Sequence, residues 1–254
     1  MSSLAATLTA PRPDLGQVSE LQARIRQMQA TKLETRSLET HPAIAGLLPG
    51  GALRAGAAYS VQGSTTLLMA LLAGPSAAGS WCGVVGMPDF GAEAAGRFGI
   101  DLERLVLVPH PGDQWLTVTA AVVDVLTVVV VAPSGRAKDG DVARLSARLR
   151  QRDATLIVVG DWPQAEAKLS ISNSGWRGLG FGNGYLSSRQ VTVTATARNG
   201  MGASRSARLW LPDPGEHFRQ AEEQVASLIA PLEAVPQLAP FEAVPLIASL
   251  EAVS

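Results

Sequence analysis

Short apolar runs alternate along the chain with segments of helical periodicity. An uninterrupted apolar run is typical of a strand buried on both faces of a sheet, whereas apolar residues three or four positions apart are typical of a helix. The predicted strands are residues 57–61, 81–86, 105–108, 127–132 and 155–159. The predicted helices are residues 65–74, 91–98, 113–126 and 139–152. This order predicts an α/β fold in which helices flank a mostly parallel sheet.

The pattern changes after the last of these strands. Residues 190–197 and 204–211 alternate between apolar and polar side chains, and Asn199-Gly200 lies between them. Alternation on both sides of a turn dipeptide indicates two antiparallel strands. We therefore expect antiparallel strands at one edge of the sheet and a folded core over residues 41–212.

The N-terminal segment has its own pattern. Residues 1–18 are small, polar and proline-containing, which predicts disorder. A helix is predicted over residues 19–38, with Leu21, Ile25 and Met28 near one face. This narrow apolar stripe either packs on its own domain or docks on a neighbouring subunit or partner, and the sequence leaves both alternatives open.

Residues 213–254 are expected to form a C-terminal helix and a repeated tail. The motif Glu-Ala-Val follows Leu232, Phe241 and Leu250, so it recurs every nine residues. Prolines between the repeats prevent a continuous helix. We expect the tail to be either a linker or a peptide that folds on a partner, with these three residues as candidate contacts.

Composition narrows the function classes. The 254 residues and the net charge of −1 fit one α/β domain with terminal extensions, and they argue against a protein that coats DNA. The single cysteine, Cys82, excludes a disulfide within the chain, and the three histidines lack the spacing of metal ligands. The sequence contains neither an evident signal peptide nor an apolar stretch long enough to cross a bilayer. We expect a cytoplasmic protein with no metal, no cofactor and no membrane partner.

A shortened phosphate-binding loop follows the first predicted strand. Gln62, Gly63, Ser64, Thr65 and Thr66 stand between that strand and a helix, as a nucleotide-binding loop would. A working loop uses several glycines to expose N–H groups and a lysine to neutralise the phosphates. This segment has one glycine and no lysine, so we interpret it as a degenerate site.

The second position that such a site requires is also altered. A carboxylate that holds magnesium is expected at the end of the strand 128–131, and the chain continues there with Ala132. Asp89 and Glu93 follow another strand, where capping of a helix explains them better than catalysis. Loss at both positions predicts a protein without catalytic residues.

The order of these elements resembles the RecA-like fold and, more narrowly, the ImuA family of bacterial damage-induced mutagenesis. The resemblance covers residues 41–212. It is carried by residues 48–53, 59–67, 97–105 and 128–131 and by the hairpin around Asn199-Gly200. The shortened loop is most similar to the actinobacterial form, ImuA-prime.

This resemblance implies a biological role. Members work with ImuB, an inactive relative of Y-family polymerases, and through it with an error-prone polymerase. The resemblance therefore implies a scaffold in translesion synthesis. It also implies self-association, because RecA-like proteins dock an N-terminal helix on a neighbour. Recombinase activity is not carried over, since it depends on the missing nucleotide residues.

Contacts to single-stranded DNA are a weaker expectation. RecA-like proteins place a DNA-contacting loop after the fifth strand, here residues 161–188, which contain Lys168, Trp176 and Arg177. Arg136 and Lys138 follow the altered magnesium strand and are further candidates. Cations and aromatic rings on a flexible loop suit a single strand. The alternative is a surface loop whose tryptophans pack back on the domain, and the small number of cations in it favours that alternative.

Two rival functions remain. The first is a weak ATPase that binds single-stranded DNA and uses Ser64, Thr65 and Asp89. The second is an inhibitor of cell division, because ImuA-like proteins share ancestry with SulA-type folds.

Overall fold

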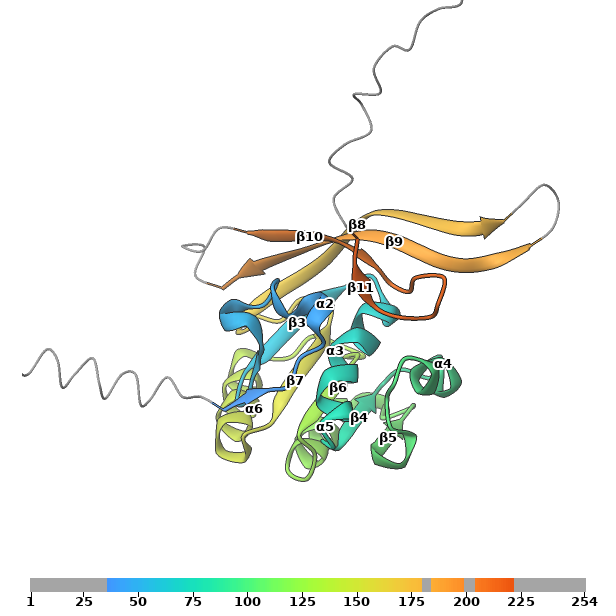
Figure 1. Cartoon of the computed structure of the whole chain (residues 1–254). Coiled ribbons are helices and arrows are strands. Elements are labelled where there is room, and N and C mark those ends of the chain that lie inside the picture. The colour runs from blue at the N-terminus through green and yellow to red at the C-terminus, as the bar shows by residue number, and fades with distance from the viewer. Residues whose placement is uncertain (1–35, 180–183, 199–203, 222–254) are drawn as a thin grey trace, which may run out of the picture. The chain divides into compact units, whose positions relative to one another are not determined.

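The computed structural model describes residues 36–179, 184–198 and 204–221 (Figure 1). The strands are β1 (Ser37–Leu38), β2 (Leu53–Arg54), β3 (Ala58–Gln62), β4 (Cys82–Val85), β5 (Leu105–Val108), β6 (Val128–Val131), β7 (Thr155–Val159), β8 (Ala167–Leu179), β9 (Gly184–Ala197), β10 (Arg205–Trp210) and β11 (Arg219–Gln220). The helices are α2 (Pro42–Ala45), α3 (Thr65–Ala77), α4 (Ala92–Arg97), α5 (Trp115–Val123) and α6 (Asp139–Arg152). Most of the strands form one sheet in the order β11-β10-β9-β8-β3-β7-β6-β4-β5, and β1 pairs with β2.

The central strands of the large sheet are parallel and covered on both faces. Strand β6, four consecutive valines, is fully buried. Val128 and Val130 pack in the cluster that contains α3, whereas Val129 and Val131 pack in the cluster that contains α5 and α6. This alternation is the reason that the sequence is apolar at every position of the strand. The predicted parallel sheet with flanking helices is confirmed.

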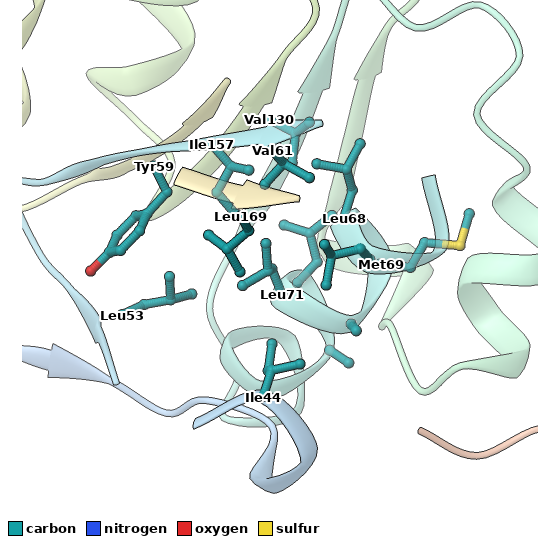
Figure 2. Packing of buried hydrophobic residues seen from close by; sticks show 14 of the residues in the cluster. Ile44, Leu53, Tyr59, Val61, Leu68, Met69, Leu71, Val130, Ile157 and Leu169 are labelled. Carbon is teal, nitrogen blue, oxygen red and sulfur yellow. The ribbon is translucent and has the colours of Figure 1, made fainter. Parts of the chain in front are cut away.

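Helix α3 is the centre of the larger cluster (Figure 2). Leu68 and Leu71 of this helix are buried against the sheet, while Ile44 and Leu53 from the segment before β3 close over it. The hydroxyl of Tyr59 accepts a hydrogen bond from the backbone N–H of Arg54 (3.0 Å), and burial raises the pKa of this phenol to about 12. The chain before the sheet is thereby fastened over the helix.

The antiparallel strands β8 to β11 form an extension of the sheet that we call the wing. The expectation of a flexible loop over residues 161–188 is wrong, because β8 occupies Ala167–Leu179 and β9 begins at Gly184. Gly175 and Gly178 lie where the ladder between β8 and β9 is irregular and its register shifts. At Gly178 (φ 117°) a Cβ atom would collide with the backbone of Tyr185, so this glycine is a requirement of the hairpin.

Three smaller expectations also change. The helix predicted to reach residue 38 does not include Ser37–Leu38, which form β1 because they pair with Leu53–Arg54. The helix predicted from residue 113 begins as a 3-10 turn, and α5 is shorter than expected. Residues 213–221 make a turn and strand β11, not the start of a helix, since β11 pairs with β10.

Several predictions fall on residues 1–35, 199–203 and 222–254, outside the described residues. They are the disordered N-terminus, most of the N-terminal helix with Leu21, Ile25 and Met28, the turn at Asn199-Gly200, and the repeated tail with Leu232, Phe241 and Leu250.

Gly74 sets how closely α3 approaches residues 39–41, the segment that crosses this helix. A Cβ atom at this position would lie 2.5 Å from the backbone N of His41 and 2.8 Å from the carbonyl O of Glu39. Alanine normally stabilises a helix interior relative to glycine. Here we expect Gly74→Ala to lower the free energy of unfolding by about 1–3 kcal/mol, because backbone must move. Urea denaturation measures the effect.

Gly140→Ala is the matched control, because Gly140 lies in α6 with nothing within 4 Å of the added atom. This variant should be neutral or more stable by up to about 1 kcal/mol. A Gly74→Ala protein as stable as the Gly140→Ala protein would contradict the close packing of α3.

Asp213 organises the turn between β10 and β11. Its carboxylate accepts hydrogen bonds from the backbone N–H groups of Gly215 (2.8 Å) and His217 (2.9 Å) and from Nε of Arg219 (2.7 Å). Burial alone would raise the pKa of Asp213, but these donors, His217 first, outweigh it and hold the pKa below its usual value. The carboxylate is therefore favoured in the folded protein.

Asp213→Asn should lower the free energy of unfolding by about 1–3 kcal/mol at neutral pH. Because folding lowers the pKa, the contribution of the carboxylate is present above about pH 5 and is lost as the pH falls through the lowered value. The difference between the two proteins should therefore shrink in urea titrations near pH 3. Glu93→Gln, in an exposed ion pair with Arg97, is the control and should cost less than about 1 kcal/mol.

Candidate functional site

The degenerate loop is a turn of minimal length between β3 and α3. Gly63 adopts φ 78°, and Ser64 then caps the helix by accepting a hydrogen bond from the N–H of Leu67 (3.2 Å). Since Ser64 already satisfies a donor of the first helical turn, fewer N–H groups remain for an anion. The chain passes from strand to helix without the wide loop that surrounds nucleotide phosphates.

The side chain of Gln62 is directed to the end of the neighbouring strand. Its Nε2 donates to Oδ1 of Asp161 (3.1 Å), and Nζ of Lys168 lies 2.6 Å from the same oxygen. Lys168 is the main cause that lowers the pKa of Asp161. Lys168 is therefore engaged by a carboxylate that follows β7.

Arg189 brings a guanidinium to the start of α3. Its Nη1 is 3.4 Å from Oγ of Ser64, its Nε donates to Oγ of Ser174 (2.8 Å), and it lies over the ring of Trp176 at 5.5 Å. Sequence reasoning missed this residue, because only the pairing of β8 with β9 and the closeness of β9 to α3 place it here. The side chain is held by contacts within the wing.

The end of β6 is closed by backbone contacts. Ala132 donates its N–H to the carbonyl of Val85 (2.9 Å), and Gly86 packs so closely on the carbonyl of Ala132 that a Cβ atom would collide with it. The position of the expected magnesium carboxylate is thus occupied by Ala132, whose backbone packs directly against Gly86. Glu93, which follows β4 in the sequence, forms an ion pair with Arg97 (2.7 Å).

A cleft of about 460 Å³ lies in front of the degenerate loop. Thr65 and Thr66 at the start of α3 line it together with Asp89, which stands after β4. The opposite wall comes from the far part of the β8–β9 hairpin, residues 174–179 and 184–188, which we call the arm. The structure therefore brings Thr65 and Asp89 to the same cleft, although they are far apart in sequence.

The arm is unusually apolar for an exposed hairpin. Trp176 (48% exposed), Tyr185 (77%) and Leu186 (49%) line the cleft, and Leu179 is 68% exposed. Large apolar side chains grouped at an exposed surface mark a site of interaction. In Figure 1 the arm extends past the helices beneath the sheet.

The predicted DNA contacts do not lie together in the structure. Arg136 and Lys168 line a second cavity of about 760 Å³, whereas Lys138 directly precedes α6 and is not part of its lining. Arg177 lies over the ring of Trp210 at 5.2 Å. Trp176 belongs to the cleft, so adjacent residues that the sequence grouped together face opposite sides of the arm.

The described residues contain no group of three or more His, Cys, Asp or Glu side chains placed to hold a metal ion. None of the helices in these ranges is long and apolar enough to cross a membrane.

Comparisons with known proteins support this architecture. Residues 46–164 match the family model described as the MT3502 N-terminal domain. The uncharacterised protein Rv3395c of Mycobacterium tuberculosis is 36% identical over 134 residues, a match that spans 51% of this chain and 66% of that protein. A KaiC-like protein, PH0186 of Pyrococcus horikoshii OT3, matches in structure with a TM-score of 0.51 over 74% of this chain and 99% of its own, at 14% identity. The chain therefore has a RecA-like fold, and over residues 46–164 it is similar to the MT3502 N-terminal domain.

Proposed function

We propose that this protein is a non-catalytic RecA-like scaffold of the cytoplasm that binds ImuB in a damage-induced translesion synthesis complex. The observation that carries the proposal is the turn at Gly63 and Ser64, which replaces a phosphate-binding loop. The named partner and the pathway come from the resemblance to the ImuA family.

The geometry of the turn supports the absence of catalysis. Transfer of a phosphoryl group needs N–H donors, a cation and a metal placed around the phosphates. Here Ser64 caps the helix, Lys168 is paired with Asp161, and β6 ends at Ala132. A bound triphosphate would lack each of these stabilising groups.

The arm supports a role in binding a protein. Rigid aromatic side chains beside a concave surface are typical of the residues that dominate binding energy at interfaces. Trp176 is held in place by Arg189, and Tyr185 stands with its ring exposed beside the cleft. We assign ImuB to this surface. The N-terminal helix and the tail remain predicted additional contacts, and self-association through that helix stays a prediction.

We expect no turnover of ATP with magnesium by the full-length protein above the rate of a buffer blank, because the site lacks a lysine and a magnesium carboxylate. Release of phosphate measures this. Thr65→Ala and Asp89→Asn are the decisive variants, since both side chains line the cleft. Turnover that either substitution abolishes would replace this proposal by the weak ATPase.

We expect full-length protein to retain ImuB in a pull-down and the double variant Trp176→Ala/Tyr185→Ala to bind it at least about tenfold more weakly, because both rings would be buried in the complex. Biolayer interferometry gives the dissociation constants. Deletion of residues 222–254 measures the predicted contribution of the tail separately.

Trp81→Ala/Leu107→Ala is the control for exposed apolar surface, because Trp81 is 47% and Leu107 39% exposed and neither lines the cleft. This control should bind ImuB as the unaltered protein does. Failure of the full-length protein to bind ImuB, together with binding to the tubulin-like division protein, would favour the division inhibitor.

A further inference from the structure

The wing is cationic, although the net charge of the whole chain is close to zero. The net charge of the protein is −1, yet residues 167–212 contain six lysines and arginines and no aspartate or glutamate. These cations are Lys168, Arg177, Arg189, Arg198, Arg205 and Arg208. A strongly cationic segment in a nearly neutral chain produces a local positive potential.

Strand alternation sorts the side chains of the wing into two faces. Val191, Val193 and Leu209 are buried in the cluster with α3. The alternate residues face the other way, as the contact between Oγ1 of Thr194 and Oγ of Ser206 (3.1 Å) across β9 and β10 confirms. We call this side the outer face.

The middle of the outer face is a row of hydroxyl groups. Thr192, Thr194 and Thr196 of β9 stand opposite Arg208, Ser206 and Ser204 along the neighbouring strand. Thr196, Ser206 and Arg208 are exposed. Hydroxyls and arginines are donors to phosphate oxygens, so the row suits a chain of phosphates.

An aromatic ring with arginines stands at one end of the outer face. Arg177 lies 5.2 Å and Arg219 5.6 Å from the centre of the Trp210 ring. Arg219 is paired with Asp213, whereas no ion pair within the described residues involves Arg177 or Arg208. Guanidinium planes and indole rings both stack on unpaired bases.

The cavity of about 760 Å³ lies at the other end. Arg136, Arg198 and Lys168 line it, and Lys168 also belongs to the outer face. Trp162 also lines this cavity. Asp139 and Asp161 are the carboxylates of this cavity, and Asp161 is neutralised by Lys168. The six steps from Thr196 to Gln190 span about 20 Å between the two ends.

We propose that the outer face of the wing binds single-stranded nucleic acid. The phosphates follow the hydroxyl row between Arg198 and Arg208, and a base stacks at Arg177 and Trp210. Four-stranded sheets bind two or three stacked bases in this way. The site is separate from the proposed ImuB surface, which lies on the cleft side of the arm.

The test is fluorescence anisotropy of a labelled oligothymidylate with the full-length protein at low salt. We expect saturable binding that weakens as salt increases, because phosphates release counterions. Arg177→Glu/Arg208→Glu should weaken binding by tenfold or more. Arg104→Glu/Arg150→Glu makes the same change in net charge at exposed positions outside the wing and should change affinity by less than about threefold.

A second comparison isolates the aromatic ring. Trp210→Leu should weaken oligothymidylate binding severalfold, whereas Trp176→Ala, on the cleft side of the arm, should not. Thermal melts of each variant confirm folding before affinities are compared. The proposal would be overturned if the outer-face and control arginine variants bound the oligothymidylate equally well. It would also be overturned if the protein bound heparin as tightly as the oligothymidylate and Trp210→Leu had no effect. Binding of ImuB is measured separately on the Arg177→Glu/Arg208→Glu variant. Retained ImuB binding would show that the proposed scaffold function does not depend on the nucleic acid site.

Discussion

The burial of α3 between the sheet and the segment that crosses it is the constraint on which the rest of the structure depends. Gly74 permits backbone to lie directly on the helix, and Tyr59 fastens the crossing segment through Arg54. The turn at Gly63 and Ser64 joins β3 to the first turn of this helix, and the cleft opens before Thr65.

The wing gives this fold two surfaces of different chemistry. Because side chains alternate along each strand, one side of β8 and β9 carries aromatic residues toward the cleft, while the other carries hydroxyls and cations. A partner protein and a nucleic acid strand, both proposed here, would therefore occupy opposite sides of one hairpin. Such an arrangement suits a scaffold, since the two ligands do not compete for the same side chains.

The sequence predicted some elements well and others poorly, for physical reasons. Strands β5 and β7 and helix α6 have the bounds expected from their apolar spacing, because burial of each depends on its own side chains. Strand β8 was mistaken for a loop. Its glycines and polar residues are compatible with a strand only because β9 and β3 supply the hydrogen-bond partners.

The altered site followed from the sequence alone. The residue types alone show that the loop has one glycine and no lysine and that Ala132 follows the valines of β6. Tertiary packing cannot supply a side chain that the sequence lacks. Tertiary structure alone decided which groups surround that site. Arg189 contacts Ser64, and Lys168 is paired with Asp161. Trp176 and Arg177 lie on opposite faces of the hairpin. Strand register sets all of these contacts, and the local sequence does not encode that register.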